Sequence, residues 1–287
     1  MSIEGKHNGQ GLQKNHDGSF EERRFSFGKN WKNYACTISK KDVTIAEQSL
    51  QKALEGWNTN TRTFLDIGCG SGLFSLAARR LGFKKALSFD YDQDSVEVTT
   101  QLKNHWSAND DNWVVTHGSI LDLDYMNRIG KFSMVYSWGV LHHTGDMWAA
   151  LINAINAVEP EGRLYIAIYN DQGFISRYWH FIKQLYVGSS GFGKKIMIAI
   201  YTVYFALLGF VADVVRLRNP LRRYVTADHR GMKFFYDVVD WIGGYPFEVA
   251  KPEEIEDFVK KRGFTLLWSK TVGRRLGCNE YIFERHD

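Results

Sequence analysis

The chain has 287 residues, of which 44% are hydrophobic, 15% aromatic and 24% charged, and its formal net charge is +4. This length accommodates one α/β domain with an accessory element, and so small a net charge does not by itself indicate nucleic-acid binding. Three widely spaced cysteines form no CxxC pair, so we expect no disulfide framework and a cytoplasmic protein. The polar N-terminus, MSIEGKHNGQ, lacks the apolar segment of a signal peptide.

A first helix is expected from Asp42, which can cap its N-terminus, to Glu55, with Gly56 as the stop. Strand and helix patterns then alternate along the chain. Strands are expected over residues 62–67, 86–89, 113–117, 132–138 and 163–169, and helices over 73–81, 94–106 and 147–158. This alternation predicts a parallel sheet with helices on both faces.

The alternation stops at Asn170 and resumes at Lys251, where Pro252 suits the first turn of a helix that runs to about residue 261. Two more strands are expected, over residues 265–271 and 279–283. We therefore predict a main domain formed by residues 57–170 and 251–287, and an insertion at 171–250 after the fifth strand. Residues 1–56 form an N-terminal segment and helix.

The strongest motif is the segment from Thr63 to Gly72, TFLDIGCGSG, in which a strand enters a glycine-rich turn that opens a helix. Glycines allow a ligand to approach the backbone closely. The third glycine of the run GCGSG, Gly72, comes one residue too early for the dinucleotide fingerprint GxGxxG, and Asp66 precedes Gly68 by two residues. A carboxylate there suits an ammonium group better than a phosphate, and S-adenosylmethionine has an ammonium group and no phosphate.

A second acidic residue, Asp90, ends the second strand 22 residues after Gly68, where a carboxylate can accept both hydroxyls of a ribose. The alternative is that Asp90 caps the helix over residues 94–106. Tyr91 is a candidate to stack on the adenine, and Ser119 and Ile120 are candidates to contact its ring.

The successive segments LDIGCGSGLFS, FDYD, GSILD, YSWGVLHHTGD and VEPEGRLYIAIYN resemble the motifs of class I S-adenosylmethionine-dependent methyltransferases. The resemblance covers residues 62–170, and YSWGVLHHTGDMW, FGKNW and DVVDWIGGYPFEVAKPEEI resemble an uncharacterised bacterial branch near the quinone-pathway O-methyltransferases. It implies a Rossmann-like, seven-stranded, mostly parallel sheet with helices on both faces and a helical insertion.

The resemblance also implies residue roles. Asp66, Gly68, Gly70 and Gly72 would hold the methionine part of the cofactor, and Asp90 its ribose. Cys69, Ser137 and Trp31 complete the expected cofactor contacts, with Phe27, Asn30 and Tyr34 closing the same side. The N-terminal segment and helix, residues 1–56, are thus expected to cover the cofactor site. S-adenosylhomocysteine would be the product.

Two adjacent histidines, His142 and His143, follow the end of the fourth strand, where the reacting centre of such folds lies. Methyl transfer is an in-line displacement that depends on positioning, and a hydroxyl acceptor also benefits from a base. We expect one histidine, with His143 preferred, to act as the base or to orient the acceptor. The alternative is that both only shape the cofactor pocket.

The methyl acceptor is expected to be a small molecule with a hydroxyl group. The fourth strand lacks the [DNS]PP[YFW] signature, and no Pro-Cys pair is present, which argues against nucleic-acid bases as acceptors. No cluster has metal-ligand spacing. The alternatives left open are an RNA methyltransferase, an enzyme acting on a lipid or quinone-like acceptor at a membrane surface, and a non-catalytic protein that binds the cofactor or a lipid.

The insertion is expected to cover the acceptor site as a lid. Arg230, Asp240, Trp241, Tyr245 and the strand-end Tyr169 are the candidate acceptor contacts. Residues 196–212, IMIAIYTVYFALLGFVA, form an apolar run of 17 residues with basic residues on both sides. We expect a lid or homodimer helix there, with a helix on a membrane surface and a true membrane span as alternatives.

Overall fold

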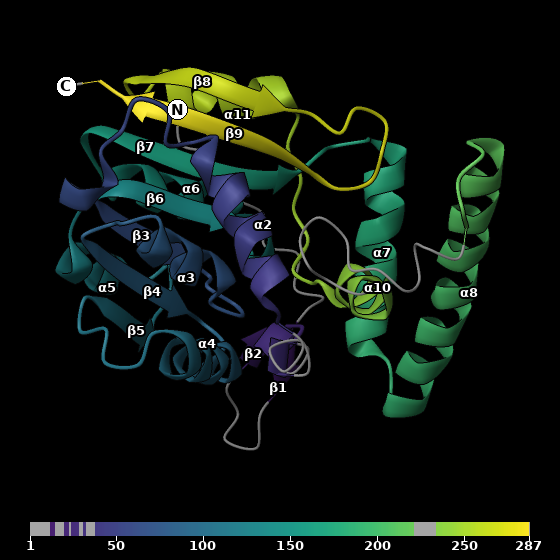
Figure 1. The fold of residues 1–287 in the computed structure, drawn as a ribbon. Helices are drawn as coiled ribbons and strands as arrows, with labels where there is room; N and C mark the ends of the chain where they lie inside the picture. The colour runs from purple at the N-terminus through teal and green to yellow at the C-terminus, as the bar shows by residue number, and fades with distance from the viewer. Residues whose placement is uncertain are drawn as a thin grey trace.

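The structure is a computed structural model that describes residues 12–14, 20–22, 24–28, 31–32, 38–220 and 234–286. Its centre is a seven-stranded sheet with the order β5-β4-β3-β6-β7-β9-β8 (Figure 1). The strands are β3 (Thr63–Ile67), β4 (Lys85–Asp90), β5 (Trp113–His117), β6 (Phe132–Trp138), β7 (Val158–Tyr169), β8 (Phe264–Lys270) and β9 (Cys278–Arg285). Strands β3 to β7 pair in parallel, and β9 is antiparallel to both of its neighbours. The predicted Rossmann-like α/β fold is confirmed.

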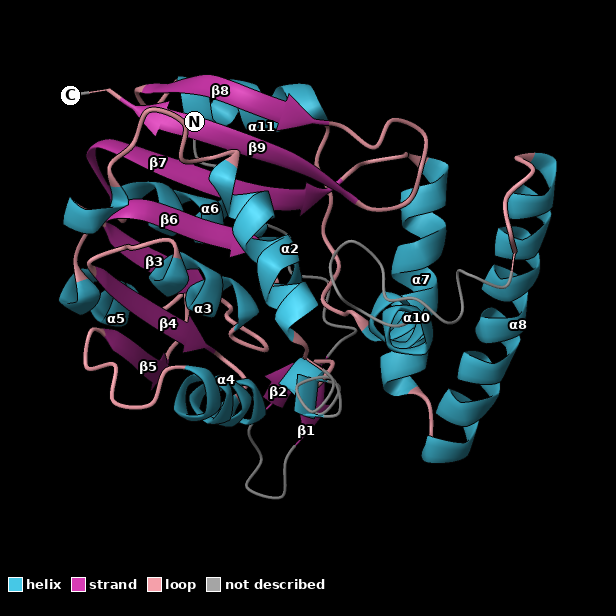
Figure 2. Cartoon of the chain, viewed as in Figure 1, coloured by secondary structure: helices cyan, strands magenta, loops and turns pink. Residues whose placement is uncertain are grey.

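Helices cover both faces of the sheet (Figure 2). One face packs against α2 (Lys40–Gln51), α3 (Leu73–Arg80) and α4 (Gln93–Trp106), whose apolar sides bury Leu50, Leu76 and Leu102. The other face packs against α5 (Leu123–Ile129), α6 (Met147–Asn156) and α11 (Pro252–Lys260). Two apolar layers therefore hold the sheet rigidly between them.

Several features differ from the sequence prediction, and the first helix, for example, ends at Gln51 and not at Glu55. Asp42 does not cap the first helix: Ser39 is the N-cap, and its N–H donates to Asp42 Oδ2 at 2.8 Å in a capping box. The helix predicted over residues 147–158 ends at Asn156, because Val158 already pairs with Phe132 in the sheet. The prediction also missed α5, a short helix that Asp122 caps through Tyr125 N–H at 3.0 Å.

Two short elements lie outside the main sheet. Strands β1 (Leu12–Lys14) and β2 (Phe20–Glu22) form an antiparallel pair that the sequence did not indicate. The 3-10 turns η1 (Thr59–Thr61) and η2 (Leu141–His143) precede β3 and follow β6. Turn η2 matters for the site because it carries both candidate histidines.

The insertion contains α7 (Phe174–Gly188), α8 (Gly191–Val215) and α10 (Phe234–Gly243), and these helices stand beside one end of the sheet (Figure 1). They share an apolar core to which α7 contributes Trp179, Ile182 and Tyr186, while α10 contributes Val238 and Ile242. Helix α8 is longer than the predicted apolar run of residues 196–212. It is the one helix of the described chain that is long and apolar enough to cross a membrane.

Candidate functional site

A cavity of about 1240 Å³ lies at the carboxyl ends of strands β3 to β7. Each strand contributes the residues that follow it: the glycine loop after β3, Tyr91 after β4, Ser119 after β5, His143 after β6 and Tyr169 at the end of β7. Ligand pockets usually measure roughly 300–1,000 Å³. The cavity therefore has room for a nucleoside cofactor and a second molecule.

The glycine loop adopts a backbone that only glycines adopt readily. The φ angles of Gly68, Gly70 and Gly72 are 73°, 54° and 77°. A Cβ on Gly68 would lie 2.5 Å from the Val140 side chain, and one on Gly70 would lie 3.0 Å from the Trp31 ring. The N–H groups of Gly68 and Cys69 both donate to the Phe89 carbonyl, at 2.8 and 3.1 Å, which fixes the loop to β4.

The carboxyl group of Asp66 is 3% exposed and belongs to the cavity wall. It accepts a short hydrogen bond from the Ser75 hydroxyl, and no salt bridge to it occurs within the described residues. Burial raises the pKa of the Asp66 carboxyl to about 7, although the Ser75 bond opposes this shift. A buried carboxylate without a cation is costly, so this position favours a positively charged ligand group.

Asp90 lies beside the glycine loop, because its Oδ2 accepts the Gly70 N–H at 3.0 Å and its Oδ1 accepts the Asp92 N–H at 2.9 Å. Burial raises the pKa of the Asp90 carboxyl to about 6. Each carboxylate oxygen has a second lone pair, so both can still accept a hydroxyl. Asp90 is not the helix cap, since Asp92 caps α4 through Asp94 N–H at 3.0 Å.

The remaining predicted cofactor residues separate into two groups. Tyr91, Ser119, Ile120 and Cys69 line the cavity, and Tyr91 is 57% exposed. Ser137 does not belong to its lining: it is fully buried and its hydroxyl donates to the Ile67 carbonyl at 3.3 Å. Ser137 therefore supports the strand that carries the glycine loop and does not face the cavity.

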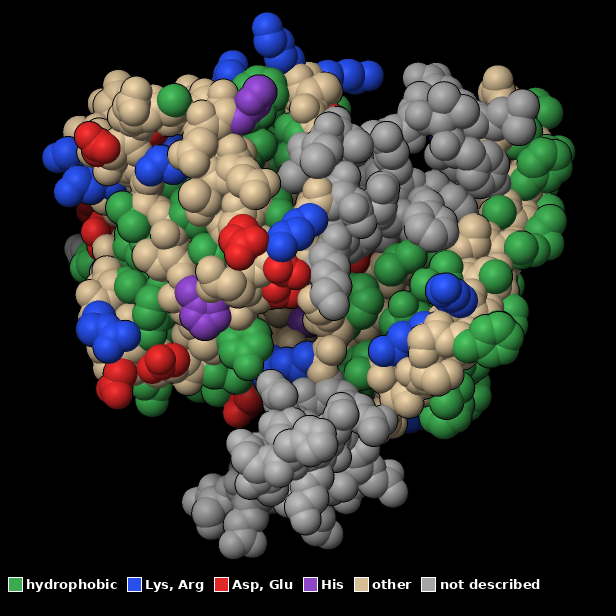
Figure 3. Space-filling model, turned by 90° about the horizontal axis from the view of Figure 1, so that it is seen from below, with side chains coloured by type: hydrophobic (Ala, Val, Ile, Leu, Met, Phe, Trp, Pro, Cys, Tyr) green, Lys and Arg blue, Asp and Glu red, His purple; other side chains and the backbone are tan. Residues whose placement is uncertain are grey.

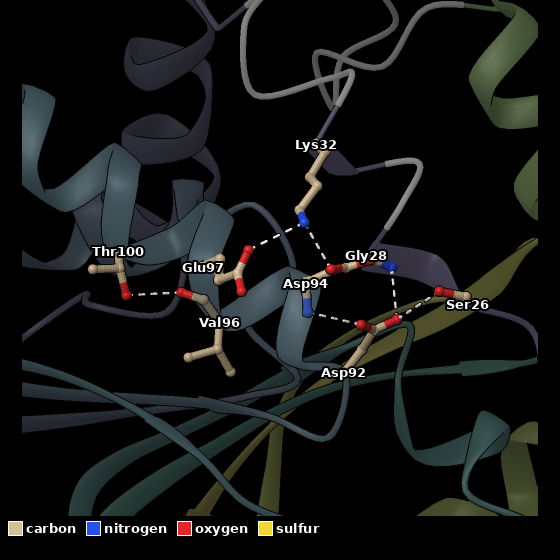
Figure 4. A network of polar contacts seen from close by, with 8 residues as sticks. All are labelled: Ser26, Gly28, Lys32, Asp92, Asp94, Val96, Glu97 and Thr100. Carbon is tan, nitrogen blue, oxygen red and sulfur yellow. Dashed lines mark hydrogen bonds and ion pairs between the residues drawn. The ribbon is translucent and has the colours of Figure 1, made fainter.

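Ser26, Gly28 and Lys32 of the N-terminal segment contact the first turn of α4 (Figure 4). Gly28 N–H and the Ser26 hydroxyl donate to Asp92 Oδ2 at 2.9 and 3.2 Å. Lys32 pairs with Asp94 at 2.7 Å. The neighbouring Trp31 ring lines the cavity above Gly70, and the Phe27 side chain lines the cavity as well. The predicted contacts Asn30 and Tyr34 lie outside the described residues.

His143 lines the cavity and is neutral. Its Nδ1 lies 2.6 Å from the Pro246 carbonyl oxygen, which can only accept, so Nδ1 carries the proton and Nε2 is a hydrogen-bond acceptor. Burial lowers the pKa of His143 to about 3, and the nearby Lys183 adds to this shift. A neutral imidazole that presents an acceptor is suited to orienting a hydroxyl group.

His142 has a different position from that of its neighbour. It is fully buried, it does not belong to the cavity lining, and its Nδ1 accepts the Tyr169 N–H at 3.3 Å. Its ring lies 3.9 Å from the Tyr169 ring, centroid to centroid. Burial lowers the pKa of His142 far below its usual value. His142 thus packs behind Tyr169 and supports it.

The predicted acceptor residues Tyr169, Asp240, Trp241 and Tyr245 all line the same cavity. Arg230 lies outside the described residues. The indole Nε1–H of Trp241 is buried and has no hydrogen-bond acceptor among the described residues. Because a buried donor without a partner costs stability, this N–H is a candidate to bind an oxygen of a ligand.

Lys183, a fully buried lysine on α7, was not predicted from the sequence as a site residue. Its ammonium group donates to the Trp241 carbonyl and lies 4.6 Å from the Trp241 ring and 4.8 Å from the Phe247 ring. Burial lowers the pKa of Lys183 to about 7. The sequence indicates this position only by its spacing, because Lys183 stands four residues after Trp179 and three before Tyr186 and so shares the apolar side of α7.

Comparisons with known proteins agree with this geometry. A family model described as a methyltransferase domain matches residues 42–190. The chain is 41% identical over 119 residues to the ribosomal protein L11 methyltransferase of Clostridium botulinum. That match covers 33% of this chain and 37% of the relative, so the chain matches just over a third of that protein's length.

Two solved structures have a similar fold. PKMT2 from Rickettsia typhi in complex with AdoHcy has a TM-score of 0.57 and 14% identity, covering 85% of this chain and 53% of that one. The N-methyltransferase NodS from Bradyrhizobium japonicum, in complex with S-adenosyl-L-homocysteine, has a TM-score of 0.52 and 12% identity, covering 91% and 100%. At these identities the likeness concerns the fold.

Proposed function

The chain belongs to the methyltransferase domain family, and we propose that it transfers a methyl group from S-adenosylmethionine to a hydroxyl group of a small molecule. The observation that carries this proposal is one cavity that unites the buried carboxyl group of Asp66 and the partly buried one of Asp90 with the glycine loop and the neutral His143. The carboxyl groups suit a cationic nucleoside, and the histidine suits a hydroxyl.

The residues present fit the cofactor in three respects. Asp66 would pair with its ammonium group, which supplies the cation that this buried carboxylate lacks. Asp90 would accept the two ribose hydroxyls with the lone pairs that its backbone bonds leave open. Tyr91, Ser119 and Ile120 would surround the adenine, and Trp31 would cover the loop.

When bound, S-adenosylmethionine supplies a methyl group on a positively charged sulfur. His143 Nε2 accepts the hydrogen bond of the acceptor hydroxyl, which turns a lone pair of that oxygen toward the methyl group. A pKa near 3 makes His143 a weak base, so its main contribution is orientation, and the proton that the hydroxyl loses on methylation would be released to solvent. Trp241 Nε1–H and Asp240 bind other polar groups of the acceptor, and the aromatic wall around Tyr169 excludes water.

A transfer assay with methyl-labelled S-adenosylmethionine tests this function. The protein is incubated with separate fractions of small molecules and of RNA, and the labelled product is isolated. We expect label in a small-molecule fraction and a loss of at least tenfold in turnover for His143→Ala, since positioning and acid–base groups contribute at least that much. Label in RNA, with steep dependence on salt, would instead identify an RNA methyltransferase.

A further inference from the structure

The outward side of α8 is apolar over most of its length. Its inward side packs on the insertion core through Met197, Ile198, Tyr201 and Phe205. On its outward side, Val203, Leu207 and Val211 are 59%, 61% and 58% exposed. From Ile196 to Val215 the only charged residue is Asp213, which is buried. A helix that is apolar all round belongs in a protein core or in lipid, and α8 is largely exposed.

Helix α7 extends this surface. Phe174, Tyr178, Phe181 and Leu185 recur at helical spacing, and Phe174 and Phe181 are 75% and 59% exposed. The hydroxyl groups of Tyr178 and Tyr201 lie 2.9 Å apart, so the α7 stripe adjoins α8. Figure 3 shows the hydrophobic side chains gathered over α8, at the right of the molecule. Contiguous apolar surfaces of this kind mark interaction sites.

The part of the sequence that contains α7 and α8 is basic, whereas the rest of the chain is net negative. Between Asp171 and Asp228 the sequence contains eight lysine or arginine residues and one acidic residue, Asp213. The whole chain has a net charge of only +4, so the remainder is net negative. Lys194 and Lys195 lie at the start of α8, and Arg216 and Arg218 follow its end. An apolar face with basic residues at both ends complements an anionic lipid surface.

Two other occupants fit this surface less well. A second copy paired through α8 would bring basic helix ends together in either orientation, which is repulsive. A membrane-spanning α8, about 37 Å long at 1.5 Å per residue, would carry the packed α7 and α10 into the hydrocarbon. Those helices bear Arg177, His180 and Asp240, whose burial in lipid is costly.

We propose that α7 and α8 dock on an anionic lipid bilayer and that the methyl acceptor is an amphipathic molecule that enters the cavity from the lipid. Phe205, Leu208, Gly209 and Ala212 of α8 line the cavity, and Leu208 is itself 51% exposed. The docking face and the cavity wall therefore share one helix. The acceptor class rests on the proposed function, whereas the docking does not.

Docking is tested by co-sedimentation of the full chain with vesicles of phosphatidylcholine alone or mixed with phosphatidylglycerol. We expect binding to the mixed vesicles, weakened several-fold by high salt. The variant Val203→Glu/Leu207→Glu, which alters two exposed residues outside the cavity lining, should lower the partition coefficient at least tenfold. The matched control Leu123→Glu/Leu267→Glu adds the same charge at residues that are 60% and 44% exposed on the main domain, and should bind like the wild type.

Several results would overturn the docking proposal. The wild type could stay in solution with both vesicle types, or the control variant could lose binding equally. A dimer seen by light scattering that only Val203→Glu/Leu207→Glu dissociates would assign this face to a second copy. Release from cell membranes by detergent alone, and not by alkaline carbonate, would make α8 a membrane span.

The acceptor class is tested separately. Labelled S-adenosylmethionine is incubated with an extract of the source organism, which is then divided into organic and aqueous phases. We expect the label in the organic phase, and label in the aqueous phase would contradict an amphipathic acceptor. Label in neither phase would contradict the proposed function, while docking is decided by the sedimentation alone.

Discussion

A buried and a partly buried carboxyl group, Asp66 and Asp90, lie beside the glycine loop and give this cavity its electrostatic character. Burial raises the pKa of Asp66 to about 7 and that of Asp90 to about 6, so each is costly to ionise in the free protein. A bound cation reverses that cost. Removing the Asp66 carboxyl group should therefore raise the stability of the free protein and lower its affinity for the ligand.

The variant Asp66→Asn tests this coupling. The folded-state pKa of Asp66 lies above its unfolded value, so its cost to stability is absent below about pH 4, grows as pH rises toward 7, and then stays constant. We expect the variant to be more stable than the wild type at pH 8, by on the order of 4 kcal/mol for a shift of about three pKa units, with no gain at pH 4. Denaturant titrations at both pH values measure this, and a gain that is independent of pH would contradict it.

The same carboxyl group predicts how cofactor affinity depends on pH. Pairing with an ammonium group requires the ionised form, so affinity for S-adenosylhomocysteine should fall below pH 7, by up to about tenfold per pH unit. In Asp66→Asn the affinity should be low and its pH dependence weaker. Equal slopes in both proteins would show that Asp66 does not face the ligand.

The two histidines should give different phenotypes when replaced by alanine. His143→Ala should lower turnover at least tenfold and leave the affinity for S-adenosylhomocysteine unchanged, because its Nε2 serves the acceptor. His142→Ala should lower stability by about 1–3 kcal/mol, because it removes a fully buried ring behind Tyr169. Turnover that falls only in His142→Ala would reverse these roles.

The elements around the cofactor side differ in how well the sequence predicted them. The glycine loop was predictable because its backbone requires glycines that the sequence displays. The helix α5 was not, because a helix of seven residues offers too few positions for a period to emerge. The N-terminal segment could be assigned to this side by resemblance, but its attachment to Asp92 and Asp94 depends on contacts across more than 60 residues.

Trp31 and Lys32 test what this segment contributes. Trp31→Ala removes the ring above Gly70 and should weaken binding of S-adenosylhomocysteine by about tenfold, in line with the energy of an aromatic contact. Lys32→Ala removes an exposed ion pair with Asp94, so its effect should be less than about threefold. Equilibrium binding measurements compare the two, and equal effects would mean that the segment acts only through its attachment.

The whole cavity combines the main domain, the N-terminal segment and the insertion, and strand order alone predicts the positions of the residues that the main domain contributes. Parallel strands align their carboxyl ends, so the sequence could bring Asp66, Asp90, Ser119 and His143 to one edge. It could not show that Ser137 and His142 turn away from the cavity, because a strand or turn position does not reveal side-chain direction when both sides are buried. It could not place α8 either, because an apolar run suits a core, a lid and a lipid surface alike.

Central to the proposed function is one cavity that holds the ammonium group of a nucleoside at Asp66 and its ribose at Asp90. Calorimetric titration with S-adenosylhomocysteine at pH 8 tests it most directly. We predict one binding site in the wild type, at least tenfold weaker binding for both Asp66→Asn and Asp90→Asn, and unchanged binding for Asp124→Asn, an exposed carboxyl group outside the cavity lining. No uptake by the wild type, or equal affinity in all four proteins, would contradict the account.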